Sequence, residues 1–271
     1  MRLSVVVATY EWPEALAAVL RALADQSDAD FDVVVADDGS GPATASLVDA
    51  WRSAFGDRLV HVRQADEGYR LARVRNLGAR AARGAFLVFL DGDVVPRRGF
   101  VAALRRSVVP GWFVAGKRVQ LGRELSARVL AGGLPVHRWS PPRLALAGRG
   151  RVRPLAALTP LDRRRPGRRG LPEFVPHADG YGFLLGVARD DFVRVNGYDA
   201  RYEGWGAEDV DMALRLRRLG LRCGWPGPAG TVLHLWHETR KAGRRPNDAL
   251  LAETRESGRV AALDGLRELG V

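Results

Sequence analysis

Hydrophobic runs and helical periodicities alternate along the first third of the chain. Apolar, β-branched runs predict four buried strands, at residues 3–8, 31–36, 59–62 and 85–90. Apolar positions at helical spacing predict three helices between them, one from Pro13, one ending near Phe55 and one over 71–82. Strands and helices in strict alternation form a mostly parallel sheet with right-handed crossovers, so the predicted fold class is α/β.

The pattern is less regular in the rest of the chain. It predicts further strands at 112–119, 180–188 and 231–235. It predicts a helix over 207–219, ended by Gly220, and an amphipathic helix over 249–269. The segment 138–172 is rich in Arg, Pro and Gly, which indicates a loop or an insertion.

Acidic residues follow two of the predicted strands. Asp91 and Asp93 come after the strand that ends at Leu90, and Asp37 and Asp38 come after another. Ligands of α/β sheets bind beyond the carboxyl ends of the strands. Two carboxylates two residues apart suit Mg²⁺ or Mn²⁺, although the same triplet also occurs in ordinary turns.

The segment after Asp38 has a simpler structural explanation. Ser40 precedes Pro42, and serine before a helix that starts with proline is typical of an N-cap. We therefore expect Ser40 to cap the helix that ends near Phe55. Asp37 and Asp38 would repel each other without a compensating partner, so a ligand role for them stays open beside a turn.

A second acidic cluster opens the predicted helix over 207–219. Glu208 and Asp209 would favour a helix N-terminus through the macrodipole alone. That explanation does not account for Trp205, which stands between Gly204 and Gly206 just before them. An indole face can stack on a sugar ring, and a carboxylate beside it can accept a proton as a general base.

Two histidines, His234 and His237, lie at the end of the last predicted strand. Each could be structural or a metal ligand. A closed zinc site is disfavoured because no cysteine or further histidine nearby completes a tetrahedral set.

Composition narrows the function classes. Of 271 residues, 46% are hydrophobic and 27% charged, which is ordinary for a globular protein. No apolar run is long enough to span a bilayer, and the apolar run at 3–7 is typical of a strand rather than a signal peptide. One cysteine, Cys223, excludes an internal disulfide. We expect a cytoplasmic protein, with a peripheral position at the inner membrane face as the alternative.

The net charge of +11 comes from 42 basic and 31 acidic residues, and all but two of the basic residues are arginines. Arginine binds phosphate in a bidentate way, but genomic bias explains the excess equally well. A nucleic-acid partner is not expected, because the acidic clusters at strand and helix ends would repel phosphates. A dinucleotide-binding oxidoreductase or a nucleotidyltransferase would need a glycine-rich turn near the N-terminus, and residues 8–13 contain no glycine.

Taken in order, these motifs resemble the inverting family 2 glycosyltransferases of the GT-A fold. The second half resembles the galactosyltransferases and the bacterial chondroitin-type polymerases. The resemblance covers about two thirds of the chain and is carried by the segments 5–10, 36–40, 75–84, 89–93, 197–199 and 205–209, with His234. It implies one domain with a nucleotide-sugar-binding half (1–118), a variable region (119–179), an acceptor and catalytic half (180–245) and a C-terminal helix (246–271).

The resemblance also implies roles for individual residues. Donor binding falls to Thr9, Tyr10, Glu11, Asp38, Arg75 and Asp91. Asp93 and His234 would hold the metal, with Asp91 and His237 as second choices. Asp209 would be the catalytic base and Glu208 would orient hydroxyl groups, while Trp205 and Gly206 would meet the acceptor.

The implied activity is a metal-dependent hexosyltransferase that uses Mn²⁺ or Mg²⁺. UDP-galactose, UDP-N-acetylgalactosamine and UDP-glucose rank first as donors, and a glycan, a lipid-linked or another small molecule would be the acceptor. One module implies transfer of one sugar rather than polymerisation. The segment 138–172 would recognise an acidic acceptor or anionic lipid, and Arg240–Arg245 would be a lid or a solvated turn. A catalytically inactive nucleotide-sugar-binding relative is the alternative.

Overall fold

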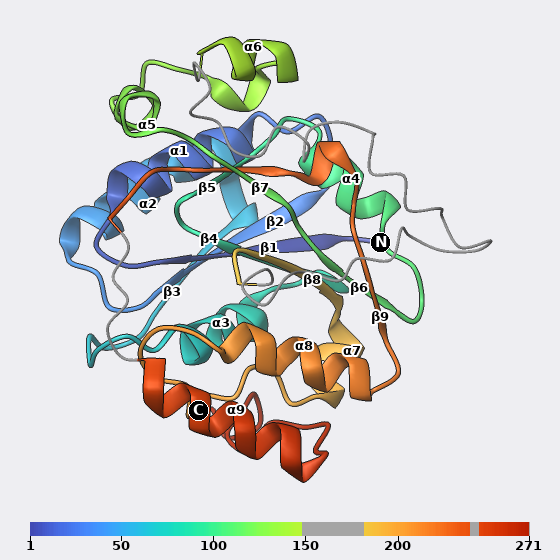
Figure 1. Ribbon diagram of the computed structural model, residues 1–271. Coiled ribbons are helices and arrows are strands. Elements are labelled where there is room, and N and C mark those ends of the chain that lie inside the picture. The colour runs from blue at the N-terminus through green and yellow to red at the C-terminus, as the bar shows by residue number, and fades with distance from the viewer. Residues whose placement is uncertain (148–181, 239–243, 271) are drawn as a thin grey trace.

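The computed structural model describes residues 1–147, 182–238 and 244–270, and it contains two sheets (Figure 1). The main sheet has seven strands in the order β3-β2-β1-β4-β8-β6-β9. Their bounds are β1 Leu3–Thr9, β2 Phe31–Asp37, β3 Leu59–Arg63, β4 Phe86–Asp91, β6 Trp112–Ala115, β8 Leu184–Ala188 and β9 Arg222–Gly224. β8 runs antiparallel to β4 and β6, and the other pairings are parallel. The mostly parallel α/β fold is therefore confirmed.

A smaller sheet joins two distant parts of the chain. It has the order β5-β10-β7, with β5 Val94–Pro96, β7 Arg118–Gln120 and β10 Val232–His234. β10 pairs antiparallel with β5 and parallel with β7. Because β5 follows β4 directly, this pairing brings the end of β10 to the carboxyl end of β4.

Helices cover both faces of the main sheet. They are α1 Pro13–Ala24, α2 Pro42–Phe55, α3 Leu71–Ala81, α4 Phe100–Arg106, α5 Arg123–Leu130, α6 Pro141–Ala147, α7 Arg189–Arg194, α8 Glu208–Arg218 and α9 Arg244–Ser257. In Figure 1, α1 and α2 lie above the sheet, whereas α3, α7 and α8 lie below it with α9 outside them. The result is a three-layer arrangement.

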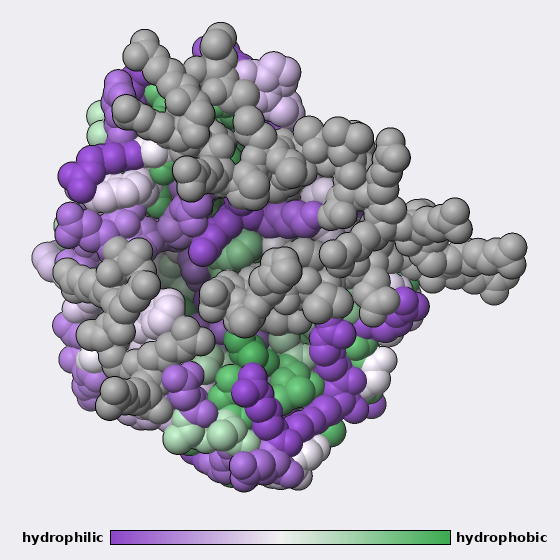
Figure 2. Space-filling view, in the orientation of Figure 1, coloured by the Kyte–Doolittle hydropathy of each residue, from purple (hydrophilic) through white to green (hydrophobic). Residues whose placement is uncertain are grey.

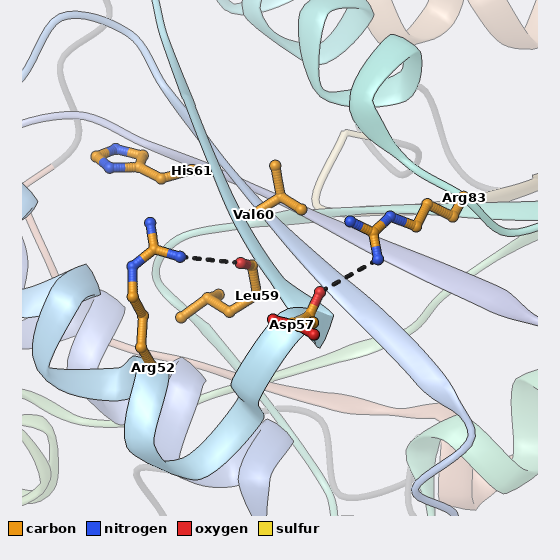
Figure 3. Close-up of a pocket in the computed structure, with 6 residues that line it drawn as sticks. All are labelled: Arg52, Asp57, Leu59, Val60, His61 and Arg83. Carbon is orange, nitrogen blue, oxygen red and sulfur yellow. Dashed lines mark hydrogen bonds between the residues drawn. The ribbon is translucent and has the colours of Figure 1, made fainter.

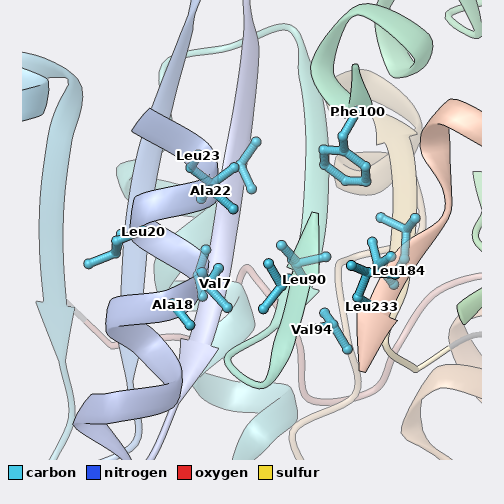
Figure 4. Close-up of a cluster of buried hydrophobic side chains, with 14 of the residues drawn as sticks. Val7, Ala18, Leu20, Ala22, Leu23, Leu90, Val94, Phe100, Leu184 and Leu233 are labelled. Carbon is cyan, nitrogen blue, oxygen red and sulfur yellow. The ribbon is translucent and has the colours of Figure 1, made fainter. Parts of the chain in front are cut away.

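The core follows from the alternation of side chains along buried strands. Val5 and Val7 of β1 belong to the hydrophobic cluster under α1, and Val6 belongs to the cluster on the other face. Strand side chains point to opposite faces in turn, so a strand buried on both sides is apolar throughout. Figure 4 shows the first cluster, where Leu90 of β4 and Leu233 of β10 meet between the two sheets. The same packing that closes the core thus positions the ends of β4 and β10.

The prediction of one strand over 112–119 is wrong. β6 ends at Ala115 in the main sheet, and β7 starts at Arg118 in the small sheet. Gly116 lies between them, and a Cβ there would come within 2.2 Å of Leu184 Cδ2. The chain changes sheets at this close approach, and a continuous apolar pattern does not reveal the change.

The predictions for the terminal helix and for Ser40 also need correction. α9 is shifted toward the N-terminus and ends at Ser257, because Gly258 turns the chain with φ +67°. The following apolar residues pack without forming a helix, with the Leu266 N–H donating to the Asn196 carbonyl at 2.9 Å. Gly41, not Ser40, is the N-cap of α2. The buried Ser40 side chain turns inward to the loop after β1.

The segment predicted as a loop or insertion, 138–172, is described only as far as residue 147, where α6 forms. Its remainder lies outside the described residues, as do Arg240 and Lys241 of the suggested lid. Within the described ranges, no helix is both long and apolar enough to cross a membrane. Hydrophilic side chains dominate the described surface in Figure 2, with a hydrophobic area where α8 lies in Figure 1.

Candidate active site

The carboxyl end of β4 and the end of β10 meet at one point. Asp91 is the last residue of β4, and Asp93 directly precedes β5. In the small sheet, His234 pairs with Val94, and the Leu235 N–H donates to the Asp93 carbonyl at 2.9 Å. This backbone register places the His234 side chain beside Asp93.

Three side chains converge there into a group that could hold a metal ion. Asp93 Oδ2 lies 3.1 Å from His237 Nε2 and 3.6 Å from His234 Nε2. One candidate ligand atom from each of the three residues lies within 4.8 Å of the others. His234 is buried, and His237 packs edge-on against Trp12 with ring centroids 6.0 Å apart. The structure therefore brings together Asp93 with both histidines, and His237 is no more remote than His234.

The protonation states of Asp93 and His234 favour metal binding, whereas His237 would have to lose the proton that Asp93 stabilises. Burial raises the pKa of Asp93, but the hydrogen bond from His237 and the nearby positive charges outweigh burial and lower the pKa overall. Burial lowers the pKa of His234, and the hydrogen bond to Asp93 raises the pKa of His237. An ionised carboxylate and a neutral imidazole are the forms that coordinate cations.

A buried guanidinium organises the other side of the turn. Arg75 on α3 is 1% exposed, and its Nη2 donates to Asp91 Oδ1 at 2.7 Å and to the Gly182 carbonyl at 2.8 Å. Its Nη1 donates to Glu208 Oε1 at 3.2 Å. The guanidinium carbon lies 5.1 Å from the centre of the Tyr198 ring. Arg75 thus joins the N-terminal half of the chain to the start of α8.

Two carboxylates, Asp91 and Glu208, bind this guanidinium, and Asp209 lies within its electrostatic reach; the pKa values of all three shift upward. Burial and the neighbouring Asp209 raise the pKa of Glu208 to about 7, although Arg75 opposes the shift. Burial also raises the pKa values of Asp91 and Asp209, again against the effect of Arg75. Within the described part of the chain, Glu208 Oε2 has no hydrogen-bond partner although it is buried. Such perturbed carboxyls are typical of functional sites.

The loop before α8 has an unusual backbone that sets the direction of these acids. Gly204, Gly206 and Ala207 all have positive φ, with Ala207 at +76°. A positive φ is costly for alanine, so the surrounding contacts must hold the loop in place. Among those contacts, Asn247 donates to the Gly206 carbonyl at 2.9 Å. Trp205, in the same loop, is 37% exposed, and its role in sugar stacking stays a prediction.

On the donor side, Asp38 is held by the loop that precedes α3. Its Oδ2 accepts the Arg70 N–H at 2.9 Å, and its Oδ1 accepts a short hydrogen bond from Gln64. The Asp38 N–H donates to the Thr9 carbonyl at 3.0 Å. Asp38 is 4% exposed, so its carboxylate orders this loop in the described structure. Its contact with a nucleobase stays a prediction.

Tyr10 and Glu11 form the turn after β1. The Tyr10 hydroxyl donates to Asp66 Oδ2 at 3.3 Å, and the Tyr10 side chain is 47% exposed. The Glu11 carboxylate accepts a short hydrogen bond from the Gly41 N–H. The structure therefore places Thr9, Tyr10 and Asp38 in one loop cluster at the sheet end, and their donor-binding roles stay predictions.

Three residues of the site were not found from the sequence. Tyr69 is 44% exposed, and its carbonyl accepts the Gly204 N–H at 2.8 Å, which links the donor-side and acceptor-side loops. A Cβ on Gly182 would come within 2.9 Å of Asp209 Oδ2, so glycine leaves room for that carboxylate. Arg118 lies over the Phe183 ring, and its charge helps to lower the Asp93 pKa. Of these three residues, only Tyr69 has a local signal in the sequence, because Gly68, which has φ +90°, directly precedes it.

Comparisons with known proteins agree with this geometry. Residues 4–131 match the model of glycosyl transferase family 2, and residues 171–238 match the model described as the N-terminal domain of galactosyltransferase. The chain is 32% identical over 236 residues to validoxylamine A glucosyltransferase of Streptomyces hygroscopicus subsp. jinggangensis (strain 5008), across 81% of this chain and 52% of that protein. It is 41% identical over 95 residues to chondroitin synthase of Escherichia coli, across 35% of this chain and 14% of that protein.

The fold is also that of a solved structure, GalNAc-T7 with UDP, GalNAc and Mn²⁺. The TM-score is 0.63 at 17% identity, over 94% of this chain and 48% of that one. The chain spans about half the length of the glucosyltransferase that it matches. With family-model matches in both halves and a shared fold, the chain belongs to the family 2 glycosyltransferases of the GT-A fold, with a galactosyltransferase-like segment in its second half.

Proposed function

We propose that the protein transfers one sugar from a nucleoside-diphosphate sugar to an acceptor hydroxyl, with inversion and with a divalent metal. One observation carries the proposal. Asp93, His234 and His237 converge at the end of β4, beside Asp91 and Glu208, which bind Arg75, and near Asp209, which feels its charge. A candidate cation site thus adjoins a candidate proton acceptor, as displacement of a diphosphate requires.

The residues present fit a divalent cation. One carboxylate oxygen and two imidazole nitrogens are available, and imidazole favours Mn²⁺ over Mg²⁺. When bound, the cation supplies positive charge against the charge that develops on the departing diphosphate. The fold neighbour GalNAc-T7 is described with UDP and Mn²⁺, which supports the same choice here. Arg118 lies close enough to add to this positive field.

Asp209 is the proposed general base. Its raised pKa makes it a better proton acceptor than an exposed aspartate. As the acceptor oxygen bonds to the anomeric carbon, its proton passes to Asp209, and the electrons of the breaking carbon–oxygen bond leave with the diphosphate. One displacement inverts the anomeric configuration. Glu208, whose Oε2 is unpartnered among the described residues, is proposed to accept a hydrogen bond from a sugar hydroxyl.

The proposed donors are UDP-hexoses, with UDP-glucose, UDP-galactose and UDP-N-acetylgalactosamine first. The names of the relatives, a glucosyltransferase and a chondroitin synthase, support hexose transfer. Thr9, Tyr10, Glu11 and Asp38 would border the nucleotide. Trp205 and Gly206 would meet a glycan, lipid-linked or small acceptor. Peripheral association with anionic lipid is proposed from the net charge of +11 alone.

The test is a panel of nucleotide sugars with Mn²⁺, Mg²⁺ or EDTA. Hydrolysis and melting temperature are measured for the wild-type protein, for Asp93→Ala and for the matched control Asp190→Asn, an exposed acid on α7. A bound donor raises the melting temperature by mass action. We expect one nucleotide sugar to stabilise wild type and control, and EDTA or Asp93→Ala to abolish the effect.

The outcomes separate the two functions considered. Stabilisation without any turnover, even with a range of acceptor sugars, would favour the inactive nucleotide-sugar-binding relative. A wild-type protein that responds to no nucleotide sugar under any metal condition would contradict both.

A further inference from the structure

A shallow pocket lies at the edge of the main sheet, away from the acids of the active site. It is lined by Arg52, Asp57, Leu59, Val60, His61 and Arg83 (Figure 3). Arg52 donates to the Leu59 carbonyl at 3.5 Å, and Arg83 donates to the Asp57 carbonyl at 3.3 Å. His61 differs from these two because its ring contacts a buried side chain of the next strand.

That side chain is Asp37, the last residue of β2. His61 Nε2 lies 3.1 Å from Asp37 Oδ2, with the histidine side chain 14% exposed and the aspartate side chain 1% exposed. Asp37 Oδ1 accepts the Ser40 N–H at 2.8 Å. Burial raises the pKa of Asp37, but the hydrogen bonds from His61 and Ser40 outweigh it and lower the pKa. The carboxylate is therefore held charged by two donors from different parts of the chain.

The next link reaches the donor side of the site. Ser40 is completely buried, and its Oγ accepts the Glu11 N–H at 3.0 Å. Glu11 has φ +46°, a left-handed conformation that non-glycine residues avoid. Its carboxylate in turn accepts the Gly41 N–H. The strained turn after β1 is thus held by hydrogen bonds that start at His61.

We propose that His61 is a positioning residue for donor binding. Through Asp37 and Ser40 it fixes the turn at Tyr10–Glu11, which borders the proposed nucleotide site. The kinetic consequence rests on the proposed function, but the ordering of the turn does not. Among the described residues, the hydrogen bonds of this network do not reach the proposed metal ligands or the proposed base, so the effect is on donor affinity rather than on the chemical step.

The first experiment needs no substrate. Amide hydrogen exchange at Glu11 and Gly41 is measured in wild type, His61→Phe, His61→Gln and Arg52→Gln. His61→Phe keeps the ring volume but cannot donate to Asp37, whereas Gln places an N–H near the Nε2 position. Arg52→Gln is the matched control, because Arg52 lines the same pocket but its Nε bonds to Asp49 at 3.0 Å. We expect faster exchange at both amides only in His61→Phe, because local protection reports these hydrogen bonds.

The second experiment measures donor KM and kcat with the nucleotide sugar identified by the panel. We expect His61→Phe to raise the donor KM about five- to tenfold, the order of one typical intramolecular hydrogen bond. The kcat should change less than about twofold, because no proposed transition-state contact is lost. His61→Gln should restore the KM, and Arg52→Gln should match wild type.

Equal exchange rates in wild type and His61→Phe would overturn the proposal, and so would an unchanged donor KM. If His61→Phe does not fold, Ser40→Ala tests the next link, since it removes the acceptor of the Glu11 N–H and must show the same two effects. A protein in which the exchange effect is seen but no nucleotide sugar binds would contradict the proposed function and leave the ordering of the turn intact.

Discussion

The two acids on either side of Gly92 have opposite electrostatic environments. Asp93 faces two imidazoles, and its pKa is lowered. Asp91 shares Arg75 with Glu208 and lies within the field of Asp209, and its pKa is raised. On the Asp93 side, basic side chains therefore outnumber acidic ones. On the Arg75 side, acidic side chains outnumber basic ones.

This difference assigns separate tasks to the two sides. The Asp93 side keeps an ionised carboxylate with nitrogen ligands, which suits cation binding. On the Arg75 side, burial and the proximity of other carboxylates raise the pKa values of the acids, which suits proton acceptance near neutral pH. The predictions that follow test this division, from the largest expected effect to the smallest.

Asp209→Asn should have the largest effect. We expect kcat to fall by about 10²–10⁴-fold, the contribution of a general base, with little change in donor KM. Steady-state kinetics with saturating donor measure both constants. A kcat within a few fold of wild type would show that Asp209 is not the general base.

Asp93→Asn should abolish metal-dependent turnover and spare the fold. We expect a loss of about 10²–10³-fold in kcat/KM, because charge on the departing diphosphate is no longer compensated. The melting temperature in EDTA should stay close to that of wild type. Retained activity that EDTA still abolishes would place the metal elsewhere.

Arg75→Met should destabilise the protein by about 3–5 kcal/mol at pH 8, since it leaves Asp91, Glu208 and Asp209 without their cation. At pH 5.5 the loss should be smaller, because protonation relieves the repulsion between acids with raised pKa values. Urea unfolding at the two pH values measures this. Arg194→Met, at an exposed arginine of α7, is the control and should cost little at either pH.

The two histidines should contribute to the same site by a smaller amount each. We expect His234→Ala and His237→Ala each to weaken Mn²⁺ binding by roughly ten- to a hundredfold, measured by calorimetry. If only His234→Ala weakened Mn²⁺ binding, His234 would be the metal ligand and His237 would not, as the family resemblance implies.

Glu208→Gln should reveal the raised pKa through stability in EDTA. The Glu208 pKa rises from 4.5 to about 7 on folding, so between these pH values the folded chain holds more protons than the unfolded chain. The free energy of unfolding contributed by this group therefore falls as the pH rises. The difference in melting temperature between Glu208→Gln and wild type should therefore shift by a few degrees in favour of Glu208→Gln as the pH rises from 5 to 8. A constant difference would indicate an ordinary pKa.

The sequence predicted the parts of the fold that depend on local pattern. The strands that end at Thr9, Asp37 and Asp91 are buried on both faces, so their apolar runs stood out, as did the acidic ends of the last two. Of the three-residue strands in the small sheet, β10 lies within the strand predicted at 231–235, whereas β5 was missed and β7 was merged with β6. Their pairing nevertheless brings His234 to Asp93, a contact that the resemblance suggested and that periodicity could not.

Contacts made by residues that belong to no recognisable motif could not be predicted from the sequence. His61 and Gln64 reach Asp37 and Asp38 only because β3 pairs in register with β2, and no motif marks them. Ser40 was mistaken for a helix cap because a cap and an inward-facing hydroxyl share the same local sequence. Such errors fall where tertiary partners, rather than neighbours in sequence, decide what a side chain does.

The division between the two sides of Gly92 is tested most directly by electron paramagnetic resonance of Mn²⁺ added to the metal-free protein, with echo detection of nitrogen couplings. We predict one Mn²⁺ bound per chain, with couplings from two imidazole nitrogens. They should disappear in Asp93→Asn and persist in Asp209→Asn. Mn²⁺ that binds without imidazole couplings, or equally well in Asp93→Asn, would contradict the account.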